Sequence, residues 1–253
     1  MLPRLLAALL CIAIPAAAAP PLRIAAAADL KWALEEIKTA FEKERPGSTC
    51  ALTFSSSGAL YAQLQQRAPF DVFLSADAEY PRGLARLGLG DAGGAFSYAV
   101  GHLVLWAPKD SPLPVAAKGL EALKDPRVKR VALANPKTAP YGRAAEASLK
   151  AAGLYEALRG KLVLGDNVAQ TAQFVQTGNA DLGLIARSLA RSPQLREGQC
   201  FDVPGALHPP LEQAGLVLAW AQDPAAARAF RDFLRGPKGQ AILQAHGFAP
   251  PEK

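Results

Sequence analysis

The stretch LRIAAAADLKWALEEIKTAF, residues 22–41, sets the pattern that the rest of the chain repeats. Its first part, 22–28, is short and apolar, which is typical of a buried strand. In the second part apolar residues return at the spacing of one helix face: Leu30, Ala33, Leu34, Ile37, Ala40 and Phe41. Asp29 stands between the two parts and is expected to be the N-cap of the helix. The stretch therefore predicts a strand, a tight turn and an amphipathic helix.

The same unit recurs along the chain, which favours an α/β fold. Further apolar strands, each followed by a turn and a helical pattern, are expected at 50–54, 70–74, 128–134, 161–164 and 181–185. Alternating strands and helices are typical of mostly parallel sheets with helices on both faces.

Two longer apolar stretches, 96–107 and 211–221, depart from this unit. We interpret them as a pair of antiparallel strands that join two lobes, and we expect a ligand cleft between the lobes. The C-terminal helical patterns, 225–234 and 239–245, are expected to pack on the first lobe. The predicted division is a first lobe of residues 20–97 plus 213–253 and a second lobe of residues 98–212.

The N-terminal residues 1–19 have the pattern of a secretory signal peptide. A basic start at Arg4 is followed by an apolar run, a proline and four alanines. The uncharged run is too short to span a membrane, which takes about 20 residues. Cleavage after this segment would lower the net charge from +6 to +5, and we expect an exported protein.

Composition excludes several classes of protein. Half of the residues are hydrophobic and 20% are charged, which excludes a disordered chain. Three Cys and three His without a CxxC or HExxH pattern do not provide a structural zinc site, and no cofactor is expected. No basic run exceeds two residues, so nucleic-acid binding has no sequence signal. After export Cys50 and Cys200 remain, and they are either a disulfide or two separate buried thiols.

Four turns are candidate binding elements because each follows a strand and precedes a helix. In open parallel sheets ligands bind beyond the carboxyl ends of strands. The helix starts there offer unpaired backbone N–H groups and the positive end of the helix dipole. If these turns meet in one cleft, they predict a site for a small oxyanion. The turns are Ala28-Asp29, Ser55-Ser56-Ser57-Gly58, residues 135–142 and residues 165–168.

An enzyme on the same scaffold is the rival interpretation. Ser57 would be the nucleophile of an exported serine-dependent hydrolase, which requires a base within hydrogen-bonding reach of its hydroxyl. None of the three histidines lies in the four turns. We therefore expect a binding protein with no catalytic residues.

The chain resembles the periplasmic substrate-binding proteins of ABC transporters that capture molybdate and tungstate. The motifs are IAAAADLKWALEEI, SSSGALYAQL, APFDVFLSAD, NPKTAPYGRAA, GDNVAQTAQFV and GPKGQAILQAHGF, which together span nearly the whole chain after residue 20. The resemblance implies a type II periplasmic binding protein fold, a membrane permease as partner, a periplasmic location and a monomer. It also implies that the hydroxyl and amide of Ser57 and the amides of Tyr141 and Val168 hold the anion.

Two positions differ from the pattern of these relatives. Asp29 stands where Ser or Thr is usual, and Ala186 stands where many have Tyr. An ionised Asp29 next to a dianion would be repelled by several kcal/mol at about 4 Å. We expect its carboxylate to cap its own helix while its N–H faces the ligand. The other possibilities are a protonated Asp29, or Asp29 as a direct ligand of the oxyanion's metal.

The departures leave two questions open. The hydroxyl of the absent Tyr could be replaced by Tyr141, Gln170 or Lys31. Asp29 could also accept a hydrogen bond from hydrogenphosphate, so a binder of phosphate or sulfate remains the alternative within the class.

Overall fold

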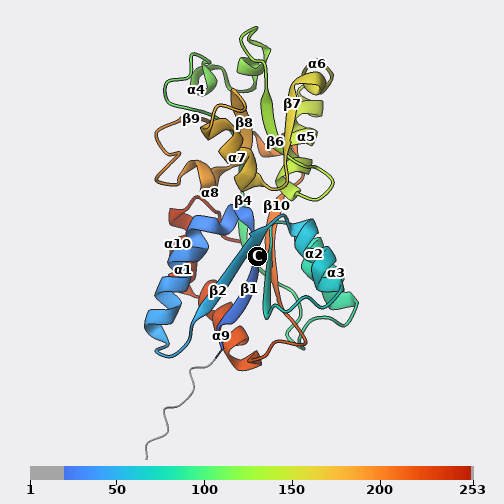
Figure 1. The fold of residues 1–253 in the computed structure, drawn as a ribbon, viewed down its shortest axis with the longest axis vertical. Coiled ribbons are helices and arrows are strands. Elements are labelled where there is room, and N and C mark those ends of the chain that lie inside the picture. The colour runs from blue at the N-terminus through green and yellow to red at the C-terminus, as the bar shows by residue number, and fades with distance from the viewer. Residues whose placement is uncertain (1–19, 252–253) are drawn as a thin grey trace, which may run out of the picture.

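The computed structural model describes residues 20–251 and shows two α/β lobes stacked along the long axis (Figure 1). The predicted signal peptide, residues 1–19, lies outside the described residues. Among residues 20–251, none of the helices combines the length and the apolar character that crossing a membrane requires.

The first lobe is built on a five-stranded sheet in the order β2-β1-β3-β10-β4. β1 is parallel to both of its neighbours, and β10 is antiparallel to β3 and β4. The strands are β1 (Leu22–Ala27), β2 (Cys50–Ser55), β3 (Val72–Ser75), β4 (Phe96–Gly101) and β10 (Leu211–Val217). After β1 comes a 3₁₀ turn (Ala28–Leu30), and the helices are α1 (Lys31–Glu44), α2 (Ser57–Gln65), α3 (Glu79–Arg86), α9 (Pro224–Arg235) and α10 (Pro237–Ala245).

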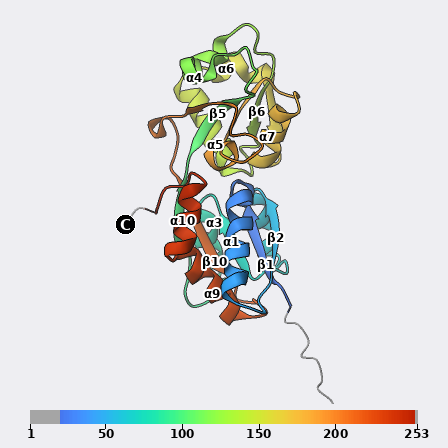
Figure 2. The ribbon, with the colours of Figure 1, turned by 90° about the vertical axis from the view of Figure 1, so that its left-hand side faces the viewer.

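Helices cover both faces of this sheet. One face packs against α1, α9 and α10, and α10 lies alongside α1 (Figure 2). Phe41 of α1 meets Phe230 and Phe233 of α9 edge to face, with ring centroids 5.2 and 5.6 Å apart. α2 and α3 cover the other face through Leu60, Leu64 and Leu84. The C-terminal helices α9 and α10 therefore pack on the first lobe.

The second lobe repeats the plan with the strand order β7-β6-β8-β5-β9. β6 is parallel to β7 and β8, and β5 is antiparallel to β8 and β9. The strands are β5 (Leu103–Ala107), β6 (Val131–Ala134), β7 (Leu162–Gly165), β8 (Leu182–Ala186) and β9 (Gln199–Asp202). The helices are α4 (Val115–Lys118), α5 (Pro140–Ala151), α6 (Tyr155–Leu158), α7 (Val168–Gln176) and α8 (Arg187–Ala190), with 3₁₀ turns at Gly119–Lys124, Arg159–Lys161 and Gly205–Leu207.

Two segments connect the lobes. β4 passes through His102 into β5, so the apolar stretch 96–107 forms two strands in two sheets. The chain returns between β9 and β10, and β10 pairs antiparallel with β4. The fold class of two α/β lobes joined by crossing strands is thereby confirmed, and each sheet is mixed, with two parallel and two antiparallel strand pairs. The boundaries expected at 97/98 and 212/213 lie within β4 and β10.

The two cysteines lie in different lobes and are both free. Cys50 is buried at the start of β2, and Cys200 is exposed in β9. The interpretation of two separate thiols therefore applies, although Cys200 is not buried. Burial and the nearby Glu42 carboxylate raise the pKa of the Cys50 thiol to about 12.

Candidate functional site

All four turns singled out in the sequence reach one small cavity between the lobes. Its volume is about 10 Å³ in this conformation, room for about one water molecule, so a larger guest requires the lobes to separate slightly. Asp29, Ser57, Tyr141 and Val168 all line it. The other lining residues are Ala27, Ala28, Ser55, Ser56, Ala76, Ala139, Pro140 and Asn167.

Three α-helices begin at this cavity, and each brings backbone N–H groups to it. α2 begins at Ser57. α5 has Pro140 at its first position, and since proline has no N–H, Tyr141 supplies the first amide of that helix. In α7 the Asn167 side chain accepts the N–H groups of Ala169 and Gln170, both at 3.0 Å, which leaves the amide of Val168 for a ligand. First-turn amides lack partners within their helix, so the cavity suits an anion.

Ser57 adds a hydroxyl to these amides. It is fully buried, and its Oγ accepts the N–H of Ala76 at 3.0 Å. Because the oxygen is already an acceptor in this bond, the hydroxyl proton is free to donate to a guest. No histidine is among the residues that line the cavity, so the structure brings no imidazole base to Ser57 within the described chain.

Asp29 does not cap its helix as expected. It lies inside the 3₁₀ turn, whose N-cap is Ala27, and neither that turn nor α1 has a side-chain cap. The carboxylate turns toward β10 instead, where Oδ2 accepts the side-chain amide of Gln213 at 2.8 Å. The physical reason is that the carboxylate accepts a hydrogen bond from Gln213 of β10, far along the chain, in place of a capping bond within its own helix. The carboxyl group is almost fully buried, at 1% exposure.

Burial controls the acidity of Asp29. Loss of solvent raises its pKa to about 6, although the hydroxyl of Tyr141, the amide of Gln213 and nearby backbone N–H groups lower it in part. Oδ1 and the Tyr141 hydroxyl, which lies close enough to this carboxyl group to lower its pKa, make no hydrogen bond of good geometry in this conformation. Within residues 20–251 these are the two buried side-chain atoms left unpaired.

A buried polar network surrounds this carboxyl group, and sequence reasoning missed it. The Tyr98 hydroxyl donates to Gln213 Oε1 at 3.1 Å and lies 3.2 Å from the carbonyl of Ser75. Ser188 of α8 donates to the backbone carbonyl of Asp29 at 2.7 Å, which links the second lobe to the first. The available signal was Gln213, which with Glu212 is one of two polar side chains in a strand pattern that is otherwise apolar.

The candidates to replace the absent Tyr at position 186 are divided between two cavities. Ala186 is buried at the end of β8. Tyr141 lines the small cavity, whereas Lys31 and Gln170 line a larger one beside it. The structure therefore places only Tyr141 of the three at the small cavity.

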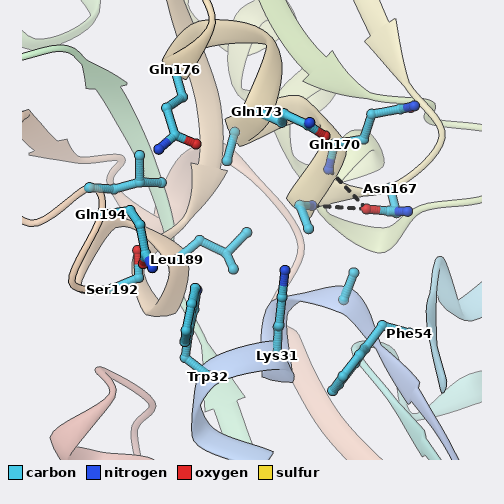
Figure 3. Close-up of a pocket in the computed structure, with 14 residues that line it drawn as sticks. Lys31, Trp32, Phe54, Asn167, Gln170, Gln173, Gln176, Leu189, Ser192 and Gln194 are labelled. Atoms are coloured by element: carbon cyan, nitrogen blue, oxygen red, sulfur yellow. Dashed lines mark hydrogen bonds between the residues drawn. The ribbon is translucent and has the colours of Figure 1, made fainter. Parts of the chain in front are cut away.

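The larger cavity, about 610 Å³, lies between the lobes and shares Ala28 and Asn167 with the small one. Figure 3 shows Lys31 and Trp32 on one side and the amide side chains of α7 on the other. Lys31 is the single charged residue among those that line it. The two cavities therefore adjoin each other between the lobes.

Direct contacts hold the lobes together beside the small cavity. The amide of Gly58 in α2 donates to the carbonyl of Thr138 in the second lobe at 2.9 Å. Arg143 of α5 reaches back to the first lobe, where it pairs with Asp77 and donates to the Tyr80 hydroxyl at 3.1 Å. The conformation described here is therefore a closed one.

Two α/β lobes that close over a small cavity at their helix starts define the class of two-lobed solute-binding proteins. The chain belongs to the bacterial extracellular solute-binding protein family, whose pattern it matches over residues 22–249. Membership in a family of binding proteins confirms that the chain is not an enzyme.

Several relatives are similar over almost their whole length. A molybdate-binding protein of Azotobacter vinelandii is 42% identical, with 92% of this chain and 91% of the relative covered. One from Rhodobacter capsulatus is 39% identical, with 96% and 93% covered. The solved structure of an Azotobacter vinelandii periplasmic molybdate-binding protein superimposes with a TM-score of 0.85 at 30% identity, covering 91% of this chain and all of the other.

Proposed function

We propose that this protein binds molybdate or tungstate in the small interlobe cavity and delivers it to the permease of an ABC transporter. The observation that carries the proposal is the convergence of three α-helix starts and the 3₁₀ turn on one cavity. The molybdate-binding relatives support the same choice of ligand. The amides of Tyr141 and Val168 and the hydroxyl and amide of Ser57 hold the oxyanion.

Neutral donors are sufficient for such a ligand. A hydrogen bond to a charged group contributes about 1.5–3 kcal/mol, and micromolar affinity requires about 8 kcal/mol. The four donors named above contribute about 6–12 kcal/mol in total, a range that includes this requirement and from which the cost of ordering the ligand is subtracted. Lys31 in the adjoining cavity adds electrostatic attraction during approach.

The arrangement favours contact with the oxygens of the anion over direct coordination of its metal. Asp29 is the only acidic residue that lines the small cavity in the described chain, and one of its oxygens is engaged by Gln213. No group of three or more potential metal-ligating side chains occurs among residues 20–251. We therefore propose that Asp29 lines the site and does not coordinate the metal of the oxyanion.

Calorimetry with molybdate, tungstate, sulfate and phosphate tests the ligand assignment. We expect tight binding of molybdate and tungstate and weak binding of sulfate, because the cavity must distinguish dianions of the same hydrogen-bonding pattern by size. Metal analysis of protein purified from medium containing all of these anions provides an independent measure. Tight sulfate or phosphate binding without molybdate binding would exclude the proposal.

Phosphate is the second candidate ligand, and one observation favours it. Hydrogenphosphate carries a proton that requires an acceptor, and Oδ1 of Asp29 is a buried acceptor without a donor. The same calorimetry separates the candidates, since a phosphate binder would prefer phosphate over molybdate at neutral pH.

Replacing Ser57 by Ala is expected to weaken molybdate binding by about tenfold, since one hydrogen bond to the anion contributes about 1.5 kcal/mol. The substitution also leaves the Ala76 amide without its acceptor. Titration of both proteins with molybdate measures the effect. Ser111→Ala serves as the control, because Ser111 lies in the loop after β5, away from the cavity. Equal affinity in the Ser57 variant would show that the Ser57 hydroxyl does not bind the anion.

Replacing Arg143 by Ala is expected to raise the molybdate dissociation rate by up to about fivefold, because partly exposed ion pairs contribute at most about 1 kcal/mol. Arg143 joins the lobes without lining the small cavity. Stopped-flow displacement at low and high salt measures the rate. The difference between wild type and variant should shrink at high salt, and a difference that grows with salt would contradict an electrostatic clamp.

Export to the periplasm completes the proposal. The signal-peptide pattern of residues 1–19 and the extracellular family both support it. Mass spectrometry of the protein recovered from a periplasmic extract is expected to show an N-terminus near residue 20. Native mass spectrometry of the same sample tests the expected monomer.

A further inference from the structure

The proposed function, on which this inference rests, leaves unexplained how a buried carboxylate at Asp29 can lie beside a bound dianion. Its buried carboxyl group lines the cavity that would receive a dianion. Oδ2 is fixed by Gln213 at 2.8 Å, whereas Oδ1 makes no hydrogen bond of good geometry, although the Tyr141 hydroxyl lies near the carboxyl group. An ionised carboxylate in this place would add a third negative charge to a closed and nearly dry site. Like charges at such distances disfavour the ionised form.

The groups that face Asp29 do not neutralise its charge. Tyr98 of β4 and Tyr141 of α5 are phenols whose pKa values are raised well above the usual value by burial and by Asp29 itself, so both stay protonated. Gln213 of β10 and Ser188 of α8 are neutral.

Two basic residues near the site are directed elsewhere. Arg187 of α8 pairs with Asp202 at 2.8 Å. Lys31 extends into the larger cavity (Figure 3). α7 contributes the neutral residues Asn167 and Val168 to the small cavity. No basic side chain forms an ion pair with Asp29 within the described residues.

We propose that Asp29 is a neutral carboxylic acid in the ligand-bound state, so that binding of the oxyanion takes up one proton. The proton moves from solvent to the Asp29 carboxylate, and no other bond is made or broken. The acid then adds a donor to a site that otherwise consists of amides and hydroxyls. It also removes an acceptor, which makes the closed site suited to fully deprotonated oxyanions and unsuited to hydrogenphosphate.

The direction in which pH changes the affinity follows from the pKa of Asp29 without and with the bound anion. In the closed conformation without a guest, burial has already raised the pKa of Asp29 to about 6. A bound dianion raises this pKa further, because it disfavours a second anion beside it. Between the two pKa values the free protein is ionised and the complex is protonated. Within that window affinity is expected to fall by about tenfold for each unit of increasing pH.

Calorimetry in buffers of different ionisation enthalpy counts the protons directly. Titrating the full mature protein with sodium molybdate in HEPES and in Tris at about pH 7.5 is expected to show uptake approaching one proton for each anion bound. Asp29→Asn, which keeps the shape and the bond to Gln213, is expected to bind molybdate with no proton uptake and with little dependence on pH. At about pH 8 its affinity should exceed that of the wild type.

His102 is the titratable group to control for, because it lies at the hinge and its pKa is lowered by burial and by Arg187. His102→Gln should leave the proton count unchanged. Infrared difference spectra of wild-type protein provide a measurement that needs no variant. Addition of molybdate should produce the carbonyl stretch of a protonated carboxylic acid, which isotope labelling of aspartate would shift.

Three results would overturn the inference: molybdate binding without proton uptake, proton uptake that persists in Asp29→Asn, or the absence of a labelled acid band. Failure of the wild-type protein to bind molybdate at any pH would instead contradict the proposed function, so the two failures are distinguishable.

Discussion

Replacing Gly58 by Ala is expected to weaken molybdate binding by about 100-fold while leaving the fold intact. Gly58 is the second residue of α2, and a Cβ there would stand 2.6 Å from the carbonyl oxygen of Thr138 in the other lobe. The Tyr80 hydroxyl would lie 2.9 Å from the same Cβ. Overpacking of this kind costs about 1–3 kcal/mol. The Tyr80 side chain can move aside within its own lobe, whereas the contact with the Thr138 backbone is relieved by separation of the lobes.

The stability of the Gly58 variant distinguishes blocked closure from damage to the fold. Alanine favours a helix over glycine by about 0.5–1 kcal/mol, so the melting temperature without ligand should stay constant or rise. Gly160→Ala is the matched control, because a Cβ there meets no atom within 4 Å. Small-angle scattering with saturating molybdate should show a more open variant. Unchanged affinity would mean that this contact does not limit closure.

The meeting of the four turns at one cavity could be predicted from sequence because it depends on local sequence patterns. Each of the four turns follows an apolar strand and precedes a helical pattern, and strand-turn-helix units place their turns at the same edge of a sheet. Asp29, Ser57, Tyr141 and Val168 accordingly line a single cavity.

The network behind the site could not be predicted, because it depends on contacts far apart in the chain. Asp29 and Gln213 are separated by 184 positions, and nothing near residue 29 indicates that β10 supplies a donor. The same contact made the predicted helix cap wrong, since the carboxylate left its own helix for a tertiary partner. The break of the stretch 96–107 at His102 was missed for a similar reason, because strands in two different sheets share one uninterrupted apolar pattern.

Replacing Gly142 by Ala is expected to lower the free energy of unfolding by about 3 kcal/mol, near the upper end of overpacking costs. A Cβ at Gly142 would stand 2.2 Å from the carbonyl oxygen of Ala134 and 2.8 Å from the carbonyl carbon of Asn135. These are backbone atoms of the same lobe, so no lobe movement relieves the clash and α5 must lift away from β6.

Because α5 carries the Tyr141 amide at its start, the Gly142 substitution should affect stability and ligand binding together, in contrast to Gly58→Ala. Urea unfolding without ligand measures the first effect, and molybdate titration well below the unfolding midpoint measures the second. Gly205→Ala, where a Cβ meets no atom within 4 Å, should change neither. A Gly142 variant of normal stability that still binds molybdate tightly would show that α5 can shift on β6 without cost. The amide of Tyr141 would then not need the close helix-to-strand packing seen here.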